Sequence, residues 1–136
     1  MVVVDASALV EMLLGRPGGP VVAQHIADHD DDLHAPHLVD LEVTNALRRA
    51  IAAEEVSGER ATYAFTTLLD LHIVRYDHAS LLPRVWSLRD NMTAYDAAYV
   101  ALAENVVEPG TPLLTTDARL ARAAREHTRV EVLLAA

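Results

Sequence analysis

The chain has 136 residues, a size that fits one domain with a substantial buried core, and we expect a single domain over residues 1–136. Hydrophobic residues make up 51% but aromatic residues only 4%, so the core must be built mainly from Ala, Val and Leu. There is no cysteine and all 11 cationic side chains are arginine. These absences exclude disulfides, thiolate zinc sites, P-loop phosphate binding through lysine and Schiff-base chemistry.

The net charge of −9 argues against non-specific adhesion to nucleic acid, which requires basic side chains to neutralise phosphates. A nucleic-acid substrate then needs a local basic surface or a bound metal ion. No apolar run approaches the length of a membrane span. The first 15 residues carry acidic side chains and no basic one, which is the wrong charge order for a secretory signal. We therefore expect a soluble, cytoplasmic protein without membrane contact.

Strand-like and helix-like segments alternate along the chain. In chain order, the sequence predicts strand 2–4, helix 6–14, helix 21–28, strand 33–35, helix 37–53, helix 59–70, strand 72–76, helix 78–89, helix 93–105, strand 112–115, helix 118–127 and strand 130–133. Pro20 is expected in the first turn of its helix, and Pro36 marks the passage to the helix that follows it. Ser57 precedes one predicted helix start, and Thr93 opens another helix. The pattern predicts an α/β fold with a mainly parallel central sheet covered by helices on both faces.

Four acidic residues lie where a predicted strand gives way to a helix, or early in such a helix: Asp5, Glu42, Asp96 and Asp117. The carboxyl ends of parallel strands meet at one edge of a sheet, and ligands of such folds bind there. Acids spread over more than a hundred positions are therefore expected to form one pocket.

Each acid also has a structural interpretation. Asp5 and Asp117 are candidate helix N-caps, although Ser7 offers a second possible cap beside Asp5. Asp96 follows Thr93 by three residues, as in a capping box. Glu42 lies inside a helix, where it is either a half-exposed side chain paired with Asn45 or Arg49, or a site residue.

Metal-dependent phosphodiester cleavage explains why several carboxylates would share one pocket. Clustered carboxylates repel one another unless a cation neutralises them. Mg²⁺ prefers oxygen ligands and needs only one or two carboxylates in addition to water and substrate phosphate oxygens. Such an ion polarises a phosphoryl group and activates water for attack.

Four short segments in this order resemble the PIN-domain nucleases, and specifically the VapC-type ribonuclease toxins of bacterial toxin–antitoxin pairs. The segments are Val4-Asp5-Ala6-Ser7, Glu42 with Asn45-Ala46-Leu47, Thr93-Ala94-Tyr95-Asp96-Ala97 and Leu114-Thr115-Thr116-Asp117-Ala118-Arg119-Leu120. The resemblance spans residues 2 to 120. It implies a three-layer α/β/α fold and an endoribonuclease that uses Mg²⁺ or Mn²⁺, held by the four acids, to hydrolyse RNA. It also implies a homodimer neutralised by a cognate VapB-type antitoxin.

Several further features remain open at this stage. Ser7, Asn45 and Thr116 are candidate supporting residues, with capping as the simpler explanation of Ser7 and Thr116. Three arginines of the helix at 118–127 offer phosphate contacts or form a solvated face. The histidines show no ligand pattern and are expected at the surface.

Alternative functions are a Mg²⁺-dependent phosphotransfer enzyme, an acidic binding module of the receiver type and a catalytically silent PIN-like interaction domain. The first two usually need a lysine, which this chain lacks. The complete set of four acids counts against the third.

Overall fold

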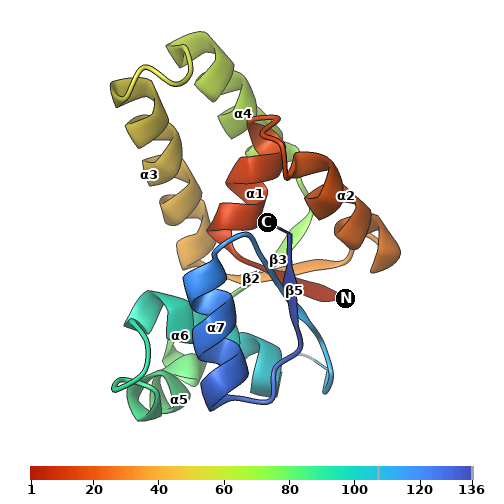
Figure 1. The fold of residues 1–136 in the computed structure, drawn as a ribbon, viewed down its shortest axis with the longest axis vertical. Helices are drawn as coiled ribbons and strands as arrows, with labels where there is room; N and C mark the ends of the chain where they lie inside the picture. Colours follow the sequence, from red (N-terminus) through yellow and green to blue (C-terminus); the bar gives the residue numbers. More distant parts are fainter. Residues whose placement is uncertain (107, 136) are drawn as a thin grey trace.

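The computed structural model describes residues 1–106 and 108–135, and at its centre is a sheet of five parallel strands (Figure 1). In chain order the strands are β1 (Val2–Val4), β2 (Leu33–Pro36), β3 (Ile73–Tyr76), β4 (Leu113–Thr115) and β5 (Val132–Leu134). Their spatial order is β3-β2-β1-β4-β5, and every neighbouring pair is parallel. The predicted α/β class with a parallel sheet is confirmed.

Helices cover the sheet from two sides. They are α1 (Ala6–Leu13), α2 (Gly19–Asp28), α3 (Leu38–Ala52), α4 (Gly58–Asp70), η1 (Ala79–Leu81), α5 (Leu82–Ser87), α6 (Ala94–Ala101), η2 (Leu102–Val106) and α7 (Ala118–His127). Figure 1 shows α1 to α4 above the strands and α5 to α7 below them. This separation follows from right-handed crossovers, because the chain moves outward from β1 to β3 and then returns across the sheet to β4 and β5.

The core lies between these layers and is made of aliphatic side chains. The three valines of β1 are completely buried, as expected for a central strand covered on both faces. Leu9 of α1 packs onto the sheet from one layer, and Leu102 and the buried alanines of α6 pack from the other. The alanines let α6 approach the sheet closely, which places its first turn beside the ends of the central strands.

The position of β1 and β4 in the sheet creates a crevice. These two strands are neighbours, but the chain leaves β1 toward β2 and leaves β4 toward β5, in opposite directions across the sheet. Connections that diverge in this way leave a gap at the carboxyl ends of the two strands, where α/β proteins bind their ligands. Asp5 follows β1 directly and Asp117 follows β4 by two residues, so both acids lie at this gap.

Some predicted boundaries were wrong by a few residues. The predicted helix at 78–89 is divided into η1 and the short α5, with Pro83 in the first turn of α5. The predicted helix at 93–105 is α-helical only as far as Ala101 and continues as the wider π-helical η2. The last strand begins at Val132 rather than at residue 130, because Leu113 of β4 pairs with Val132.

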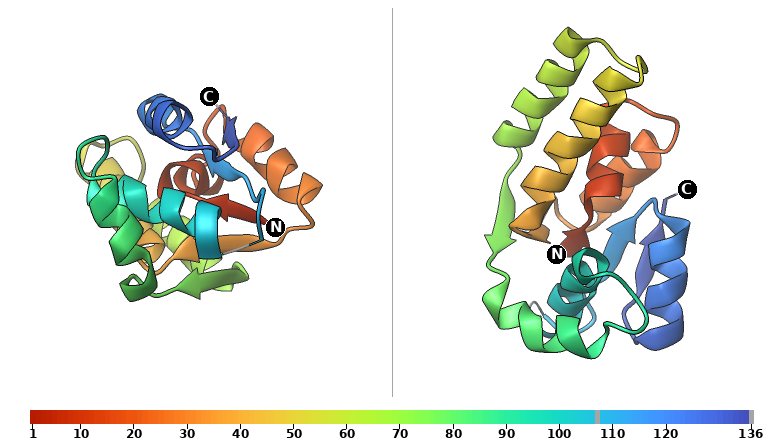
Figure 2. Two further views of the ribbon diagram at one scale, coloured as in Figure 1. Left: turned by 90° about the horizontal axis from the view of Figure 1, so that it is seen from below. Right: turned by 90° about the vertical axis from the view of Figure 1, so that its left-hand side faces the viewer.

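The two long helices α3 and α4 form an antiparallel pair that extends away from the end of the molecule that carries α5 to α7 (Figure 2). Ser57 caps α4 by accepting a hydrogen bond from the backbone N–H of Arg60, as the sequence predicted. Within the described residues, no helix combines the length and the apolar character needed to cross a membrane.

Candidate active site

A cavity of about 350 Å³ opens at the carboxyl ends of β1 and β4. All four acids predicted from the sequence line it: Asp5, Glu42, Asp96 and Asp117. They come from four separate segments, namely the end of β1, the second turn of α3, the first turn of α6 and the start of α7. The fold therefore brings together acids that are up to 112 positions apart in the sequence.

Asp5 is the most buried of the four and is held by donors on both carboxylate oxygens. Its Oδ1 accepts hydrogen bonds from the Ser7 hydroxyl at 2.7 Å and from the Ala8 N–H at 3.1 Å, and its Oδ2 accepts one from the Thr115 hydroxyl at 2.8 Å. Burial nevertheless raises the pKa of Asp5 to about 6, because desolvation of the charge outweighs these bonds. The site thus holds Asp5 rigidly but opposes its ionisation.

Asp5 is itself the N-cap of α1. The suggestion that Ser7 could cap this helix in its place was wrong, because the Ser7 hydroxyl donates to Asp5 and accepts the N–H of Thr116 at 3.1 Å. Thr115 makes the parallel connection, donating to Asp5 and accepting the N–H of Asp117 at 2.9 Å. These crossed bonds join the beginning of α1 to the end of β4 and fix the relative positions of Asp5 and Asp117.

Glu42 is oriented by a tyrosine from the opposite helical layer. The Tyr99 hydroxyl donates a 2.5 Å hydrogen bond to Oε1 of Glu42. Burial is the main cause that raises the pKa of Tyr99, and the charge of Glu42 is the next. The Tyr99 hydroxyl therefore remains protonated and acts as a donor at physiological pH. Burial also raises the pKa of Glu42, and the bond from Tyr99 is the largest influence that lowers it again.

Asp96 and Asp117 share one arginine at the rim of the cavity. The Nη2 atom of Arg119 lies 3.7 Å from Asp96 and 3.9 Å from Asp117. Asp117 caps α7 with Oδ1, which accepts the N–H groups of Arg119 and Leu120. Its second oxygen therefore remains outside the cap. Thr93 caps α6 through the N–H of Asp96, so the predicted caps at these two helices are present.

The four carboxylates repel one another across the cavity. The charge of Asp117 contributes to the raised pKa of both Asp5 and Asp96, and the charge of Asp96 contributes to that of Glu42. Burial is the main cause in each case. This combination of carboxylate oxygens and unneutralised charge fits a hard divalent cation.

In the part of the chain that the structure describes, no three acidic or histidine side chains are grouped closely enough to hold a metal ion by themselves. This spacing still fits Mg²⁺, which retains several waters and takes only one or two carboxylates directly.

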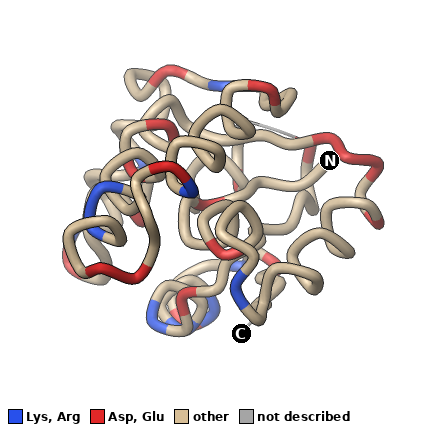
Figure 3. The backbone as a smooth tube through the Cα atoms, turned by 90° about the horizontal axis from the view of Figure 1, so that it is seen from above, with Lys and Arg blue, Asp and Glu red and all other residues tan. Residues whose placement is uncertain are grey.

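Arginines provide positive charge around the acidic centre. Arg16, Arg49 and Arg119 line the cavity together with the four acids. Figure 3 shows both acidic and basic positions at several separate places along the backbone. Of the three arginines predicted on α7, Arg119 reaches the cavity, whereas Arg125 donates to the carbonyl of Val132.

Other candidates from the sequence lie elsewhere. Ser7 and Thr116 line the cavity, but Asn45 does not; it is exposed and accepts a hydrogen bond from Arg48. The expectation of surface histidines was wrong for His34, which is buried in β2 and bonded to Tyr76 and Asp32.

Sequence reasoning did not identify Thr115 or Tyr99 as site residues. Tyr99 follows Asp96 by three positions in α6, a spacing that places both on one helix face and could have indicated it. No local signal distinguished Thr115 from Thr116, because only the strand register determines which hydroxyl faces Asp5.

Comparison with known families is consistent with this geometry. The model of the PIN domain matches residues 2–126, and the chain therefore belongs to the PIN-domain family. Within that family it is similar to ribonuclease VapC1 of Mycobacterium tuberculosis, with 44% identity over 122 residues that cover 89% of each chain. It is also 35% identical over 133 residues to ribonuclease VapC12 of the same organism, covering 98% of this chain and 99% of the relative. The predicted resemblance to VapC ribonucleases is confirmed.

A solved structure shows the same fold at greater sequence distance. The crystal structure of PAE2754 from Pyrobaculum aerophilum superposes with a TM-score of 0.63 at 24% identity, covering 96% of this chain and 81% of that one. This likeness supports the three-layer architecture alone.

Proposed function

We propose that the protein is a VapC-type toxin: an endoribonuclease that hydrolyses RNA phosphodiester bonds with the help of Mg²⁺ or Mn²⁺. The observation that carries the proposal is the convergence of Asp5, Glu42, Asp96 and Asp117 on one cavity in a chain related to VapC ribonucleases. The family match over residues 2–126 supports the treatment of residues 1–136 as one PIN domain.

Asp5 and Asp96 are the residues proposed to hold the ion mainly, and Glu42 and Asp117 would reach it through the waters that it retains. When bound, a divalent cation supplies charge neutralisation at the phosphoryl oxygens and activates water. The raised pKa values of Asp5, Glu42 and Asp96 support this assignment, because the ionised forms lack sufficient compensation within the protein.

The chain's own side chains provide positioning and proton transfer. Tyr99 fixes one oxygen of Glu42 by a hydrogen bond, which leaves the other oxygen able to accept a proton from water. Arg49 and Arg119 line the same cavity and place positive charge where a substrate phosphate would enter. The hydroxyls of Ser7 and Thr115 keep Asp5 in one orientation.

The test is cleavage of total RNA by the purified protein with Mg²⁺, with Mn²⁺ and with excess EDTA. Asp5→Asn and Asp96→Asn should each abolish cleavage while the fold is retained, because the substitution preserves shape and removes charge. Asp70→Asn is the matched control, since Asp70 is an exposed acid at the end of α4. Full cleavage in EDTA, or by either folded site variant, would refute the proposal.

A silent interaction domain and a phosphotransfer enzyme are not favoured. The silent domain has no need for four acids held by specific donors, and the relatives are named ribonucleases. A phosphotransfer enzyme on such a sheet usually needs a lysine, which this chain lacks.

We also propose that a VapB-type antitoxin neutralises the protein by inserting an Arg or Lys side chain into the acidic cavity. The placement of Arg119 between Asp96 and Asp117 supports this idea, because it shows that a guanidinium is accommodated there. Co-expression with the cognate antitoxin should restore growth that the toxin alone arrests.

A homodimer in the cytoplasm is the proposed working form. Two large apolar side chains next to the acids are exposed: Leu41 beside Glu42 and Tyr95 beside Asp96. Association would bury them. Light scattering of the purified protein tests this, and a monomer at micromolar concentration would contradict it.

A further inference from the structure

A groove continues from the catalytic cavity across the rim of the molecule. A second depression of about 380 Å³ shares Asp96 and Arg119 with the catalytic cavity. A third, of about 510 Å³, shares Arg89, Met92 and Thr93 with the second and ends at Trp86. Adjoining depressions share lining residues, and we call the surface that they cover between the acids and α5 the α5 groove.

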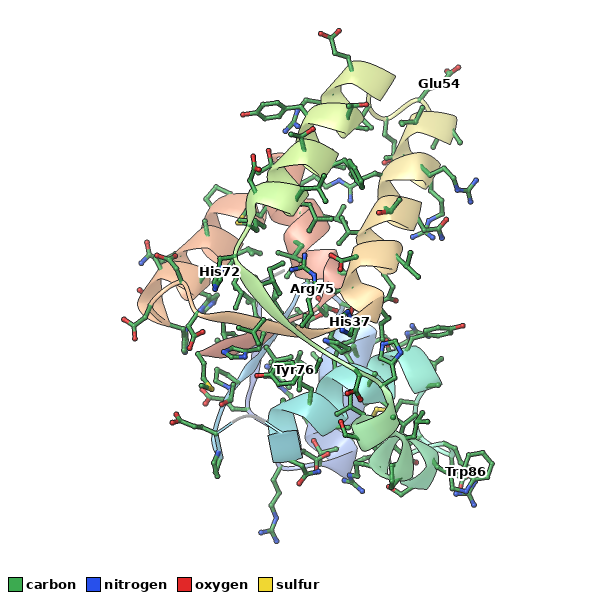
Figure 4. All side chains as sticks on the ribbon, turned by 180° about the vertical axis from the view of Figure 1, so that it is seen from behind. His37, Glu54, His72, Arg75, Tyr76 and Trp86 are labelled. Carbon is green, nitrogen blue, oxygen red and sulfur yellow. The ribbon has the colours of Figure 1, made fainter. Side chains whose placement is uncertain are left out.

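Trp86 forms an exposed platform at the far end of the α5 groove. Its side chain is 68% exposed and extends outward from α5 (Figure 4). The guanidinium of Arg89 lies 4.5 Å from the ring centroid, and its Nη1 donates to the carbonyl of Trp86 at 3.0 Å. Arg89 therefore covers one face of the indole ring, and the side chain of Trp86 as a whole remains largely exposed.

The charge along the α5 groove differs from that of the whole protein. The chain carries a net charge of −9, yet the second and third depressions are lined by two arginines, Arg89 and Arg119, and by a single acid, Asp96. Positive charge at intervals beside an exposed aromatic ring is the arrangement with which proteins bind single-stranded nucleic acid.

We propose that the α5 groove binds the nucleotides of single-stranded RNA that flank the cleaved bond, with one base stacked on Trp86 and phosphates beside Arg89 and Arg119. This inference rests on the proposed ribonuclease function and assigns to it a subsite for the nucleotides beside the cleaved bond. Bases of a duplex are already stacked and cannot reach the indole, so unpaired RNA is the substrate that this surface selects.

Trp86 is the only tryptophan in the chain, so its fluorescence reports on this site alone. The experiment titrates the full-length protein with a 12-nucleotide single-stranded RNA in EDTA, which prevents metal-dependent cleavage. We expect saturable quenching by the single strand and little quenching by the same sequence as a duplex. Cleavage of the single strand in Mg²⁺ is measured in parallel.

Variants then test the assignment by an independent binding assay, the anisotropy of labelled RNA. Trp86→Ala should weaken binding roughly 5- to 150-fold, the range observed when one stacked base loses its aromatic partner. Trp86→Phe keeps an aromatic ring and should recover most of the RNA affinity. This recovery would show that the loss in Trp86→Ala does not come from a folding defect. Arg89→Ala should reduce the slope of log affinity against log salt by about 0.7, as expected for one lost phosphate contact.

Tyr63→Ala is the matched control. Tyr63 is also 68% exposed and also lies beside an arginine, Arg60, but it belongs to α4 and does not line the groove. Its removal should leave RNA affinity unchanged.

Two results would overturn the assignment while leaving ribonuclease activity established. In the first, the wild type cleaves RNA but its fluorescence does not change when RNA is added, and Trp86→Ala binds RNA with wild-type affinity. The other is a change from dimer to monomer in Trp86→Ala at unchanged RNA affinity, which would make the surface a protein interface. If the wild type neither binds RNA in EDTA nor cleaves it in Mg²⁺, the proposed function itself fails.

Discussion

Asp5 should make the metal-free protein less stable as pH rises through the range from about 4 to 6. The folded protein raises the pKa of Asp5 from 3.8 to about 6, mainly by burial. The native state therefore holds a proton that the unfolded chain has already lost, and folding becomes less favourable as that proton is removed. A difference of roughly two pH units, at about 1.4 kcal/mol per unit, corresponds to about 3 kcal/mol of lost stability at neutral pH.

The assay compares urea unfolding of the wild type and Asp5→Asn in EDTA between pH 4 and pH 7.5. Asparagine does not titrate, and the contribution of groups distant from Asp5 cancels in the difference between the two proteins. The wild type should lose up to about 3 kcal/mol relative to the variant across this range. A difference that is independent of pH, or that changes in favour of the wild type as pH rises, would refute the burial argument.

Three further substitutions test the contacts around the acids. Tyr99→Phe removes the donor to Glu42, and we expect Mn²⁺ affinity at pH 7 to fall by up to about tenfold, measured by calorimetry; unchanged affinity would contradict the positioning role. Thr115→Val deprives Asp5 of one donor and the Asp117 N–H of its acceptor, and should cost about 1–3 kcal/mol in urea unfolding, whereas Thr115→Ser should cost much less. Asp117→Asn keeps the Oδ1 cap of α7 and reduces repulsion, so the melting temperature without metal should be unchanged or higher; a large decrease would show that capping requires the charge.

The sequence was most informative where chemistry coincides with a change of secondary structure. Asp5 and Asp117 follow short apolar strands, and parallel strands bring such positions to one edge regardless of the details of packing. Glu42 in the second turn of α3 and Asp96 in the first turn of α6 belong to helices that begin at the same edge. The order of the elements was therefore sufficient to place the four acids together.

Contacts that depend on side-chain direction could not be predicted in the same way. Whether Thr115 or Thr116 faces Asp5 depends on the register between β1 and β4, in which Val4 pairs with Leu114. The bond from Tyr99 to Glu42 depends on how closely α6 packs against the sheet. Asn45, three residues beyond Glu42 in α3, accepts a hydrogen bond from Arg48 and does not line the cavity.

The most direct test of the account is Mn²⁺ binding by the purified protein, measured by electron paramagnetic resonance at pH 7.5 in the absence of RNA. The wild type and Asp70→Asn should bind Mn²⁺ with the same affinity, and binding by the wild type should weaken as pH falls through about 6, where Asp5 becomes protonated. Asp5→Asn and Asp96→Asn should each lose this binding. Wild-type affinity in either folded variant would show that the four acids do not form the metal site.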